Sequence, residues 1–283
     1  MQSVLIRLKG YASRINEAEK GVADLVLKSP ELVVNMTIHQ LAASSFTSAS
    51  TIIRFCRKLG FAGYKDFRKA LLYEVSARKE VNDEQARKIE REDSLETIVR
   101  KVTYRNIVSL DNTNKLLNME VLGQCIELID KAQNIIFFGM GASLLVAKDA
   151  CLKFVRVNKP CQFGDDWHMQ KLHARNSTSK DIAIAISYSG TTQETIRCAE
   201  IVRKNGTPLV AITRFDASPL AKMADYNLYV ESPEMFARIG AMSSRMAQFN
   251  MIDIIYSAYV NRNYDECVPR IVHTDLRNDD EDF

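Results

Sequence analysis

The sequence has little of what marks a membrane, metal or disulfide-stabilised protein. No window of its 283 residues approaches the ~20 consecutive apolar residues of a membrane-spanning helix, and the first 30 residues carry charges throughout, without the apolar core of a signal peptide. The six cysteines form no Cys-x-x-Cys pair and have no ligand-like spacing to the four histidines. We therefore expect no membrane association and no metal site, and we expect small, mostly buried thiols in a reducing cytoplasm.

Common nucleotide-binding and catalytic motifs are also missing, although two strand-to-helix junctions contain glycine. After Gly139 and Gly141 the third glycine of a dinucleotide-binding fingerprint is replaced by Leu144, which argues against NAD. No Gly-Lys-Ser/Thr follows either junction, which argues against ATP hydrolysis, and the Gly-x-Ser-x-Gly of an α/β-hydrolase is absent. We expect no cofactor and assign no catalytic residue.

Charge is distributed unevenly along the chain. Residues 1–80 contain 13 Lys and Arg against 7 Asp and Glu, whereas the remainder contains 25 against 28. A basic segment of this kind is typical of a module that binds nucleic acid or a membrane surface. Residues 77–93 are charged with almost no apolar periodicity, and Asp93 with Glu96 predicts the start of the next helix. These features predict a domain over residues 1–77, a linker over 78–93 and a second domain over 94–283.

The basic segment has the pattern of an all-α helix-turn-helix domain. Asn16, three residues before Glu19, predicts a capping box at the start of a helix that ends before Pro30. Two short helical patterns follow, separated by a polar turn, and the second is predicted to begin with Ser48 as its N-cap and to end at Gly60. If this second helix enters a DNA groove, the exposed residues at its start and the cations that follow make the contacts: Ser48, Ala49, Ser50, Thr51, Arg54, Arg57, Lys58 and Lys65. The alternative is a basic helix face that is only solvated.

From Asn134 the pattern changes to short apolar runs that alternate with helical stretches, as in "NIIFFG", "KDIAIAIS" and "TPLVAITRF". This alternation predicts an α/β domain, a parallel sheet flanked by helices, with the sheet core over residues 134–257. The fold class is therefore α+β with two domains. The last long helical stretch, "GAMSSRMAQFNMIDIIYSAYVN", is apolar over much of its surface, which predicts either a dimer surface or a buried core helix.

Two junctions, "FFGMGASLL" and "AISYSGTTQET", place Gly, Ser and Thr where a helix begins. Amides at a helix N-terminus lack partners within the helix and carry the positive end of its dipole, so they attract phosphate, and hydroxyls can donate alongside them. The candidates are Gly141, Ser143, Ser187, Ser189, Gly190, Thr191 and Thr192. The alternative is that Ser189, Thr191 and Thr192 only cap the following helix.

The order of residues in the basic segment is more specific than helix-turn-helix spacing alone. "MTIHQLAASSFTSASTIIRFCRKLGFAGYKDFRKAL" resembles the N-terminal DNA-binding domain of the RpiR family of bacterial transcription regulators, over residues 1–77. The resemblance implies operator DNA as a partner and adds Tyr64, in the string "GYKDF", to the DNA-binding candidates. It departs from the family at the turn, where a small residue, commonly Gly, is usual and this chain has Phe46.

A second resemblance covers the predicted sheet. "FFGMGASLLVAKD", "DIAIAISYSGTTQETI" and "SPLAKMAD" resemble successive segments of the sugar isomerase (SIS) phosphosugar-binding domain, from Asn134 to Ser257. The resemblance implies that Ser143, Ser187, Ser189 and Thr192 contact the phosphate of a sugar phosphate, while Gly190 and Thr191 contribute loop shape and backbone donors. It makes Glu194 a candidate to reach a sugar hydroxyl, and the alternative is an exposed first-turn acid that favours the helix dipole.

SIS domains serve both enzymes and regulators, so the fold alone does not decide the function. A regulator would bind operator DNA of a carbohydrate catabolic operon as a homodimer or dimer of dimers, with an affinity that a sugar phosphate changes. An isomerase or lyase would need an acid and a base, for which the candidates are His168, His173, Glu231 and Glu234. A third alternative is a domain that only dimerises.

We predict that the protein is a regulator, because a helix-turn-helix domain attached to a metabolic enzyme would have no role in the reaction. The family resemblance continues around "RIGAMSSRMAQ", and there it implies an amino-sugar 6-phosphate such as N-acetylmuramate 6-phosphate as the effector.

Overall fold

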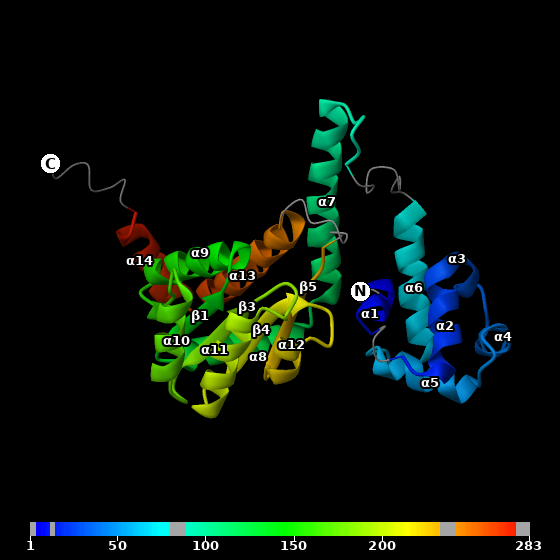
Figure 1. The fold of residues 1–283 in the computed structure, drawn as a ribbon, viewed down its shortest axis with the longest axis horizontal. Coiled ribbons are helices and arrows are strands. Elements are labelled where there is room, and N and C mark those ends of the chain that lie inside the picture. The colour runs from blue at the N-terminus through cyan, green and yellow to red at the C-terminus, as the bar shows by residue number, and fades with distance from the viewer. Residues whose placement is uncertain (1–3, 12–14, 80–88, 233–240, 276–283) are drawn as a thin grey trace. The chain divides into compact units, whose positions relative to one another are not determined.

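The structure is a computed structural model that describes residues 4–11, 15–79, 89–232 and 241–275 (Figure 1). The chain divides into two compact units, one over Met1–Leu116 with Phe215–Ala217 and one over Leu117–Arg214 with Ser218–Phe283. Residues 80–88 of the predicted linker lie outside the described residues. The helix Leu95–Leu116 belongs to the first compact unit, whereas the sequence placed it in the second domain, so the functional boundary at residues 78–93 stays a prediction.

The described part of the first unit consists of helices, as predicted for the helix-turn-helix domain. Its core contains the completely buried side chains of Leu41, Phe55 and Phe67. The predicted capping box is confirmed, because Asn16 Oδ1 accepts from the Glu19 amide at 3.0 Å and the Glu19 carboxylate accepts from the Asn16 amide at 3.4 Å. The helices are α1 (Val4–Tyr11), α2 (Glu17–Lys28), α3 (Pro30–Val33), α4 (Ile38–Ser44), α5 (Ala49–Lys58), α6 (Tyr64–Lys79) and α7 (Leu95–Leu116).

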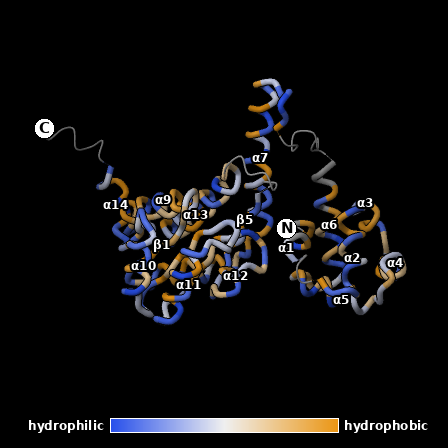
Figure 2. Tube along the Cα trace, in the orientation of Figure 1, coloured by the Kyte–Doolittle hydropathy of each residue, from blue (hydrophilic) through white to orange (hydrophobic). Residues whose placement is uncertain are grey.

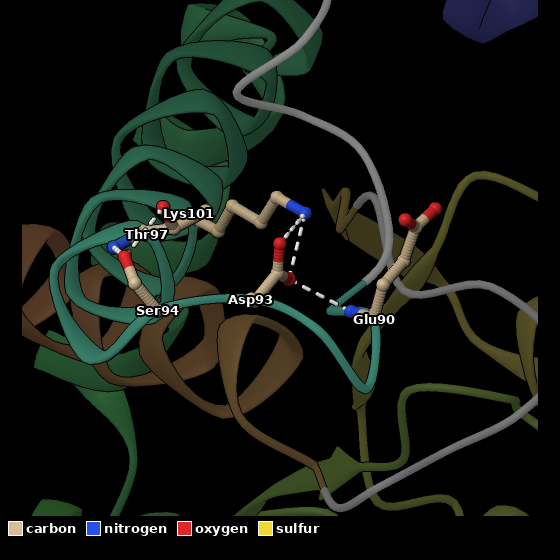
Figure 3. Close-up of polar contacts among 5 residues, drawn as sticks. All are labelled: Glu90, Asp93, Ser94, Thr97 and Lys101. Atoms are coloured by element: carbon tan, nitrogen blue, oxygen red, sulfur yellow. Dashed lines mark hydrogen bonds and ion pairs between the residues drawn. The ribbon is translucent and has the colours of Figure 1, made fainter.

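The start of α7 differs from the prediction by one residue (Figure 3). Ser94 caps the helix, because its hydroxyl accepts from the Thr97 amide at 3.2 Å, so the cap expected at Asp93 is wrong. The Asp93 carboxylate instead accepts from Lys101 Nζ at 2.9 and 2.7 Å and from the Glu90 amide at 2.7 Å. The hydrogen bond from Lys101, followed by that from the Glu90 amide, holds the pKa of Asp93 below its usual value.

The second unit combines one sheet with helices, as predicted for the α/β domain. The strands pair in parallel in the order β2-β1-β3-β4-β5, and in β1 and β3 Ile135 lies beside Ile182 and Gly139 beside Ile186. The elements are α8 (Met119–Lys131), β1 (Ile135–Gly139), α9 (Ala142–Arg156), β2 (Cys161–Gln162), α10 (Trp167–Asn176), β3 (Ile182–Ile186), α11 (Gln193–Lys204), β4 (Leu209–Arg214), α12 (Pro219–Met223), β5 (Tyr226–Val230), α13 (Ser243–Arg262) and α14 (Tyr264–His273).

Helices cover both faces of this sheet, because successive side chains of a strand point to opposite faces. Ile135 and Phe137 of β1 pack in a cluster with α8, α9 and α13, whereas Ile136 and Phe138 pack in another with α10, α11 and α12. Figure 2 shows that these helices carry both hydrophobic and hydrophilic residues, as expected for helices with one buried side. Residues of α13 such as Ile255 are completely buried in the first cluster, as the buried-core alternative predicts, and the dimer surface stays a prediction for the residues of this helix that are not buried.

The cysteines pack as small apolar residues. All six are free and five are buried. Burial raises the pKa of Cys56 and of Cys125 to about 12, so both remain neutral thiols near neutral pH. Among the helices that the structure describes, none has both the length and the apolar character that crossing a bilayer requires.

We expect Asp93→Asn to lower the thermal midpoint of unfolding more than Asp111→Asn does. The Asp93 and Lys101 side chains are only 11% and 10% exposed, whereas Asp111, paired with Lys115, is 55% exposed and screened by water. Because the pKa of Asp93 is lowered in the folded state, its stabilising effect is complete above the ordinary pKa of 3.8 and is lost as the pH falls below it. Circular dichroism melts at neutral pH and below pH 3.8 measure both effects. Equal losses in the two variants at neutral pH would contradict the prediction.

Candidate functional site

Hydroxyl groups cluster at the start of α5, on the surface of the first unit. Ser48 Oγ lies 2.8 Å from Ser50 Oγ and 2.9 Å from Thr51 Oγ1. It also accepts from the Thr51 amide at 3.2 Å, which confirms that Ser48 caps the helix. Arg54 donates to Thr51 Oγ1 at 3.3 Å, one turn further along, while Phe55 next to it is buried in the core. The start of α5 therefore presents hydroxyls and a guanidinium to the solvent, with Ala49 half-buried beside them.

The predicted cations of this surface differ in their freedom to contact a phosphate backbone. Arg54, Arg57 and Lys65 are exposed. Lys58 donates from Nζ to Glu19 Oε1 at 2.6 Å, and the Glu19 side chain is only 3% exposed. This hydrogen bond raises the pKa of Lys58. Lys58 thus ties α5 to α2, and the nearby carboxylate offsets part of its charge.

Tyr64 lies in the core of the first unit and not with these residues. Its side chain is 9% exposed, its hydroxyl donates to the Met36 carbonyl at 2.9 Å, and its ring stacks on Phe67 with 6.3 Å between centroids. Burial raises the pKa of the Tyr64 hydroxyl. The structure therefore argues against the predicted DNA contact for Tyr64 and indicates a packing role, because its phenol already has a partner inside the domain.

The turn between α4 and α5 keeps the conformation that a glycine would adopt. Phe46 has a φ of 53°, in the left-handed region, and its side chain is 99% exposed. A non-glycine residue in that region costs about 1–3 kcal/mol of backbone strain. The departure from the usual small residue therefore leaves the turn intact and lowers stability instead.

The phosphate-binding candidates lie in the second unit, at the carboxyl edge of the sheet. β1 leads into α9 and β3 into α11, and these two neighbouring strands send their helices to opposite faces. The order of strands therefore reverses between β1 and β3, which is the position where open α/β sheets bind ligands. The structure thus brings both predicted junctions, far apart in the sequence, to one place.

Neither α9 nor α11 has a side-chain cap. Gly141 at the start of α9 has no side chain to offer, and Thr192 at the start of α11 makes no side-chain hydrogen bond to the first turn. In the same unit, α8, α10 and α12 are capped by Asn118, Asp166 and Ser218, whereas α13 and α14 also begin without a side-chain cap. In α9 the Ser143 and Leu144 amides donate to the Met140 and Gly141 carbonyls at 3.1 Å each, so it is mainly the first turn of α11 that can offer amides to an anion. The lack of a side-chain cap on α11 argues against the alternative that the hydroxyls only cap this helix.

The hydroxyls of the second junction bond mainly to one another. Ser187 Oγ lies 3.1 Å from Thr192 Oγ1 and accepts from the Gly190 amide at 3.2 Å. Ser189 Oγ accepts from the Thr191 amide at 3.3 Å and from the Thr191 hydroxyl at 3.0 Å. These five residues form one compact loop, whose backbone is held by bonds such as that from the Ser187 amide to the Ile212 carbonyl and whose hydroxyls bond within the loop.

Ser143 of the first junction has a different partner. It is half-buried, and its Oγ donates to Gln248 Oε1 at 3.2 Å.

Residues outside the predicted set hold the two junctions in place. Gln170 is 1% exposed, accepts from the Gly139 amide at 3.1 Å and donates to the Gly139 carbonyl at 2.9 Å. In the second junction, Thr213 donates to the Tyr188 carbonyl at 3.2 Å. Sequence reasoning missed these contacts, because each partner is distant along the chain and belongs to no local motif.

The remaining candidates belong to several elements of the second unit. Glu194 is half-buried in the first turn of α11, and on α10 His168 is exposed and His173 half-buried. Glu231 is half-buried after β5, and Glu234 lies outside the described residues. The part of the chain that the structure describes holds no group of three or more His, Cys, Asp or Glu that could bind a metal ion.

Comparisons with known proteins agree with this division into two parts. The model of the rpiR-family helix-turn-helix domain matches residues 2–78, and that of the SIS domain matches residues 128–258. An HTH-type transcriptional regulator from Caldanaerobacter subterraneus subsp. tengcongensis is 34% identical over 278 residues, which cover 97% of this chain and 96% of that one. The chain belongs to the RpiR family of transcription regulators.

Solved structures support the same RpiR-family architecture. The Vibrio vulnificus NanR protein complexed with ManNAc-6P is 28% identical, with a TM-score of 0.59, and the match covers 95% of this chain and 96% of NanR. The sugar isomerase domain of an RpiR transcription factor from Sphaerobacter thermophilus is 18% identical, with a TM-score of 0.55. That match covers 62% of this chain and 96% of the other and shows the fold of the SIS domain alone.

We expect Gly190→Ala to destabilise the second unit more than Gly206→Ala does. Both residues have positive φ, 64° and 73°, so each variant carries backbone strain of about 1–2 kcal/mol. A Cβ on Gly190 would lie 2.0 Å from Ser218 Oγ, whereas a Cβ on Gly206 would lie 3.9 Å from Ser179 Cβ. This overlap should cost a further amount of about 1–3 kcal/mol. Urea unfolding followed by the fluorescence of the single tryptophan, Trp167, measures the difference, and equal losses would contradict a tightly packed loop.

Proposed function

We propose that this RpiR-family regulator binds operator DNA through α5 and that a sugar phosphate bound between β1 and β3 changes its affinity for the operator. The observation that supports the effector site most directly is the pair of helices, α9 and α11, that begin without side-chain caps beside a loop of hydroxyls. Amides and hydroxyls suit a phosphate group, because charge-assisted hydrogen bonds to its oxygens are stronger than bonds between neutral groups. Gly141, Ser143, Ser187, Ser189, Gly190, Thr191 and Thr192 form this site in our proposal, with Glu194 near the sugar.

An amino-sugar 6-phosphate is the effector class that we propose. NanR from Vibrio vulnificus, which aligns with nearly the whole chain, was solved with ManNAc-6P. This relative supports N-acetylmannosamine 6-phosphate and N-acetylmuramate 6-phosphate as the first compounds to test. The proposed role is regulatory and not catalytic, in the cytoplasm, in control of a carbohydrate catabolic operon.

The DNA side of the proposal rests on the surface of α5. Ser48, Ser50, Thr51 and Arg54 present donors at its start, and Arg57 and Lys65 add charge for the phosphate backbone. Two such helices in a homodimer, or in a dimer of dimers, would occupy successive major grooves ~34–36 Å apart. A difference of about 1–3 kcal/mol between the effector's affinities for the two states would change operator affinity about 5- to 150-fold.

Arg54→Ala should weaken operator binding by about 5- to 150-fold, because it removes an exposed guanidinium from the groove-facing side of α5. The DNA is a fragment selected by the wild-type protein from a random library, and gel retardation measures affinity. Lys204→Ala is the matched control, since it removes an exposed cation from α11 in the other unit. Both variants should keep the thermal stabilisation produced by a sugar phosphate. Unimpaired operator binding in Arg54→Ala would refute the assignment of α5.

Ser189→Ala should leave operator binding unchanged and raise the effector concentration for half response by about 10- to 100-fold. The expected loss is that of one hydrogen bond to a charged group. Ser179→Ala is the control, because Ser179 is an exposed serine of the same unit that precedes β3, at the opposite end of the strand, whereas Ser189 is half-buried after it. Retardation of the selected DNA against increasing N-acetylmannosamine 6-phosphate gives the response. A wild-type response in Ser189→Ala would remove the phosphate role of this residue.

A further inference from the structure

Gln248 is a buried amide that touches one of the phosphate-binding candidates, Ser143. It lies on α13, is 1% exposed, and accepts from Ser143 Oγ at 3.2 Å, which joins two residues 105 positions apart. Its Nε2 is also buried, and within the described part of the chain this atom has no hydrogen-bond partner. Because an NH₂ group without a partner is unfavourable in a protein interior, this atom points to a second arrangement in which it is satisfied.

The supply of hydroxyl protons distinguishes Ser143 from the other candidates. A serine or threonine hydroxyl can donate only one proton. Ser189 accepts two hydrogen bonds from Thr191, so its own proton remains available to an anion. Ser187 and Thr192 share one hydrogen bond, which uses one of their two protons. Ser143 directs its only proton to Gln248, so in this arrangement it cannot donate to a phosphate.

Turning the Gln248 amide by half a turn would reverse this hydrogen bond, because the carbonyl oxygen and the NH₂ group of an amide have nearly the same shape. Oε1 would then occupy the position without a partner, where an oxygen acceptor left unpaired is tolerated better than an unpaired N–H. Nε2 would then donate to Ser143 Oγ, and the proton of Ser143 would be free to point toward the ligand. The resulting chain of donors runs in one direction, from Nε2 to Ser143 and from Ser143 to a phosphate oxygen. Hydrogen bonds aligned in this way polarise and strengthen one another.

We propose that Gln248 is a positioning residue of the effector site whose amide turns over when a phosphate binds, so that Nε2 donates to Ser143 Oγ and Ser143 donates to the phosphate. The inference rests on the proposed function of this edge of the sheet. It also extends the site to α13, a 20-residue helix that packs against α8, α9 and β5. The bound and free states would thus differ at a buried contact of this helix, in addition to the loop of hydroxyls.

A double-mutant cycle on the full-length protein tests the proposal. Affinity for N-acetylmannosamine 6-phosphate is measured by titration calorimetry for the wild type, Gln248→Met, Ser143→Ala and the double variant. Methionine has a similar length and no donor or acceptor of comparable strength, so we expect Gln248→Met to weaken binding about 2- to 10-fold, the value of one hydrogen bond. In the Ser143→Ala background the same substitution should change the affinity less than about 2-fold, because the residue through which it acts is gone. In a Ser189→Ala background, Gln248→Met should weaken binding by the same factor as in the wild type.

Gln248→Glu provides a second and independent readout that preserves side-chain size. A carboxylate can only accept, so it would hold the proton of Ser143 and oppose the phosphate charge, and affinity should fall further than in Gln248→Met. Lowering the pH should restore affinity relative to the wild type, because a protonated carboxyl group regains a donor. Gln248→Met should show no such recovery. A purely structural role for Gln248 would produce neither the pH dependence nor the coupling to Ser143.

The outcomes separate this inference from the proposed function. Wild-type affinity in Gln248→Met, or equal losses from this substitution in the wild-type and Ser143→Ala backgrounds, would overturn the role of Gln248 and leave the effector site standing. A wild-type protein that binds none of N-acetylmannosamine 6-phosphate, N-acetylmuramate 6-phosphate and inorganic phosphate would overturn the effector site and this inference together.

Discussion

The amides at the start of α9 and α11 are the groups on which the second unit's proposed chemistry depends. Two neighbouring parallel strands end at one edge of the sheet, and their helices leave toward opposite faces, so the positive ends of both helix dipoles lie at that edge. Side-chain caps would have used these amides, as they do in α8, α10 and α12. In α11 their absence leaves amide donors for an anion, whereas in α9 the Ser143 and Leu144 amides already donate to backbone carbonyls. The hydroxyls of the adjoining loop add donors that the core does not need.

The interior of the second unit holds this edge in shape from several directions. Gln170 bonds both the amide and the carbonyl of Gly139 at the end of β1, and Ser218 lies so close to Gly190 that no side chain fits there. Gln248 differs from these residues, because one of its two polar atoms is satisfied and the other is not. Contacts that are complete fix the backbone, whereas an incomplete contact leaves a side chain with two possible arrangements. The same edge can therefore be rigid in its backbone and adjustable in its hydrogen bonds.

In the first unit, one side of α5 packs in the core and another side carries the candidate DNA contacts. Phe55 and its buried neighbours fix α5 in the core, and the Lys58–Glu19 ion pair fixes its end against α2. The hydroxyls at its start and Arg54 remain at the surface. The strained turn at Phe46 shows that the conformation of the turn is imposed by the two helices that it joins, because the residue itself disfavours a positive φ.

Local signals account for the parts that were predictable from the sequence. The capping box at Asn16, the cap at Ser48 and the hydroxyl loop after β3 each involve residues within a few positions of one another, and each appears where predicted. The prediction for α7 failed by one residue because Ser94 and Asp93 are both good caps, and the ion pair of Asp93 with Lys101 decided between them. The DNA contact of Tyr64 was predicted from a motif alone. Its hydroxyl donates to the Met36 carbonyl, a residue distant along the chain, and no local pattern predicts such a hydrogen bond.

Periodicity and neighbouring residues were enough to predict a helical basic part, a parallel α/β part, and the hydroxyls that lie at the helix starts, because these features are set locally along the chain. The adjacency of β1 and β3, the burial of α13 residues such as Ile255, and the contacts of Gln170 and Gln248 with the first junction became visible only in the folded chain. The physical reason is that these contacts join segments 31 and 105 positions apart, and such pairs are selected by how the helices pack on the sheet and not by any local preference.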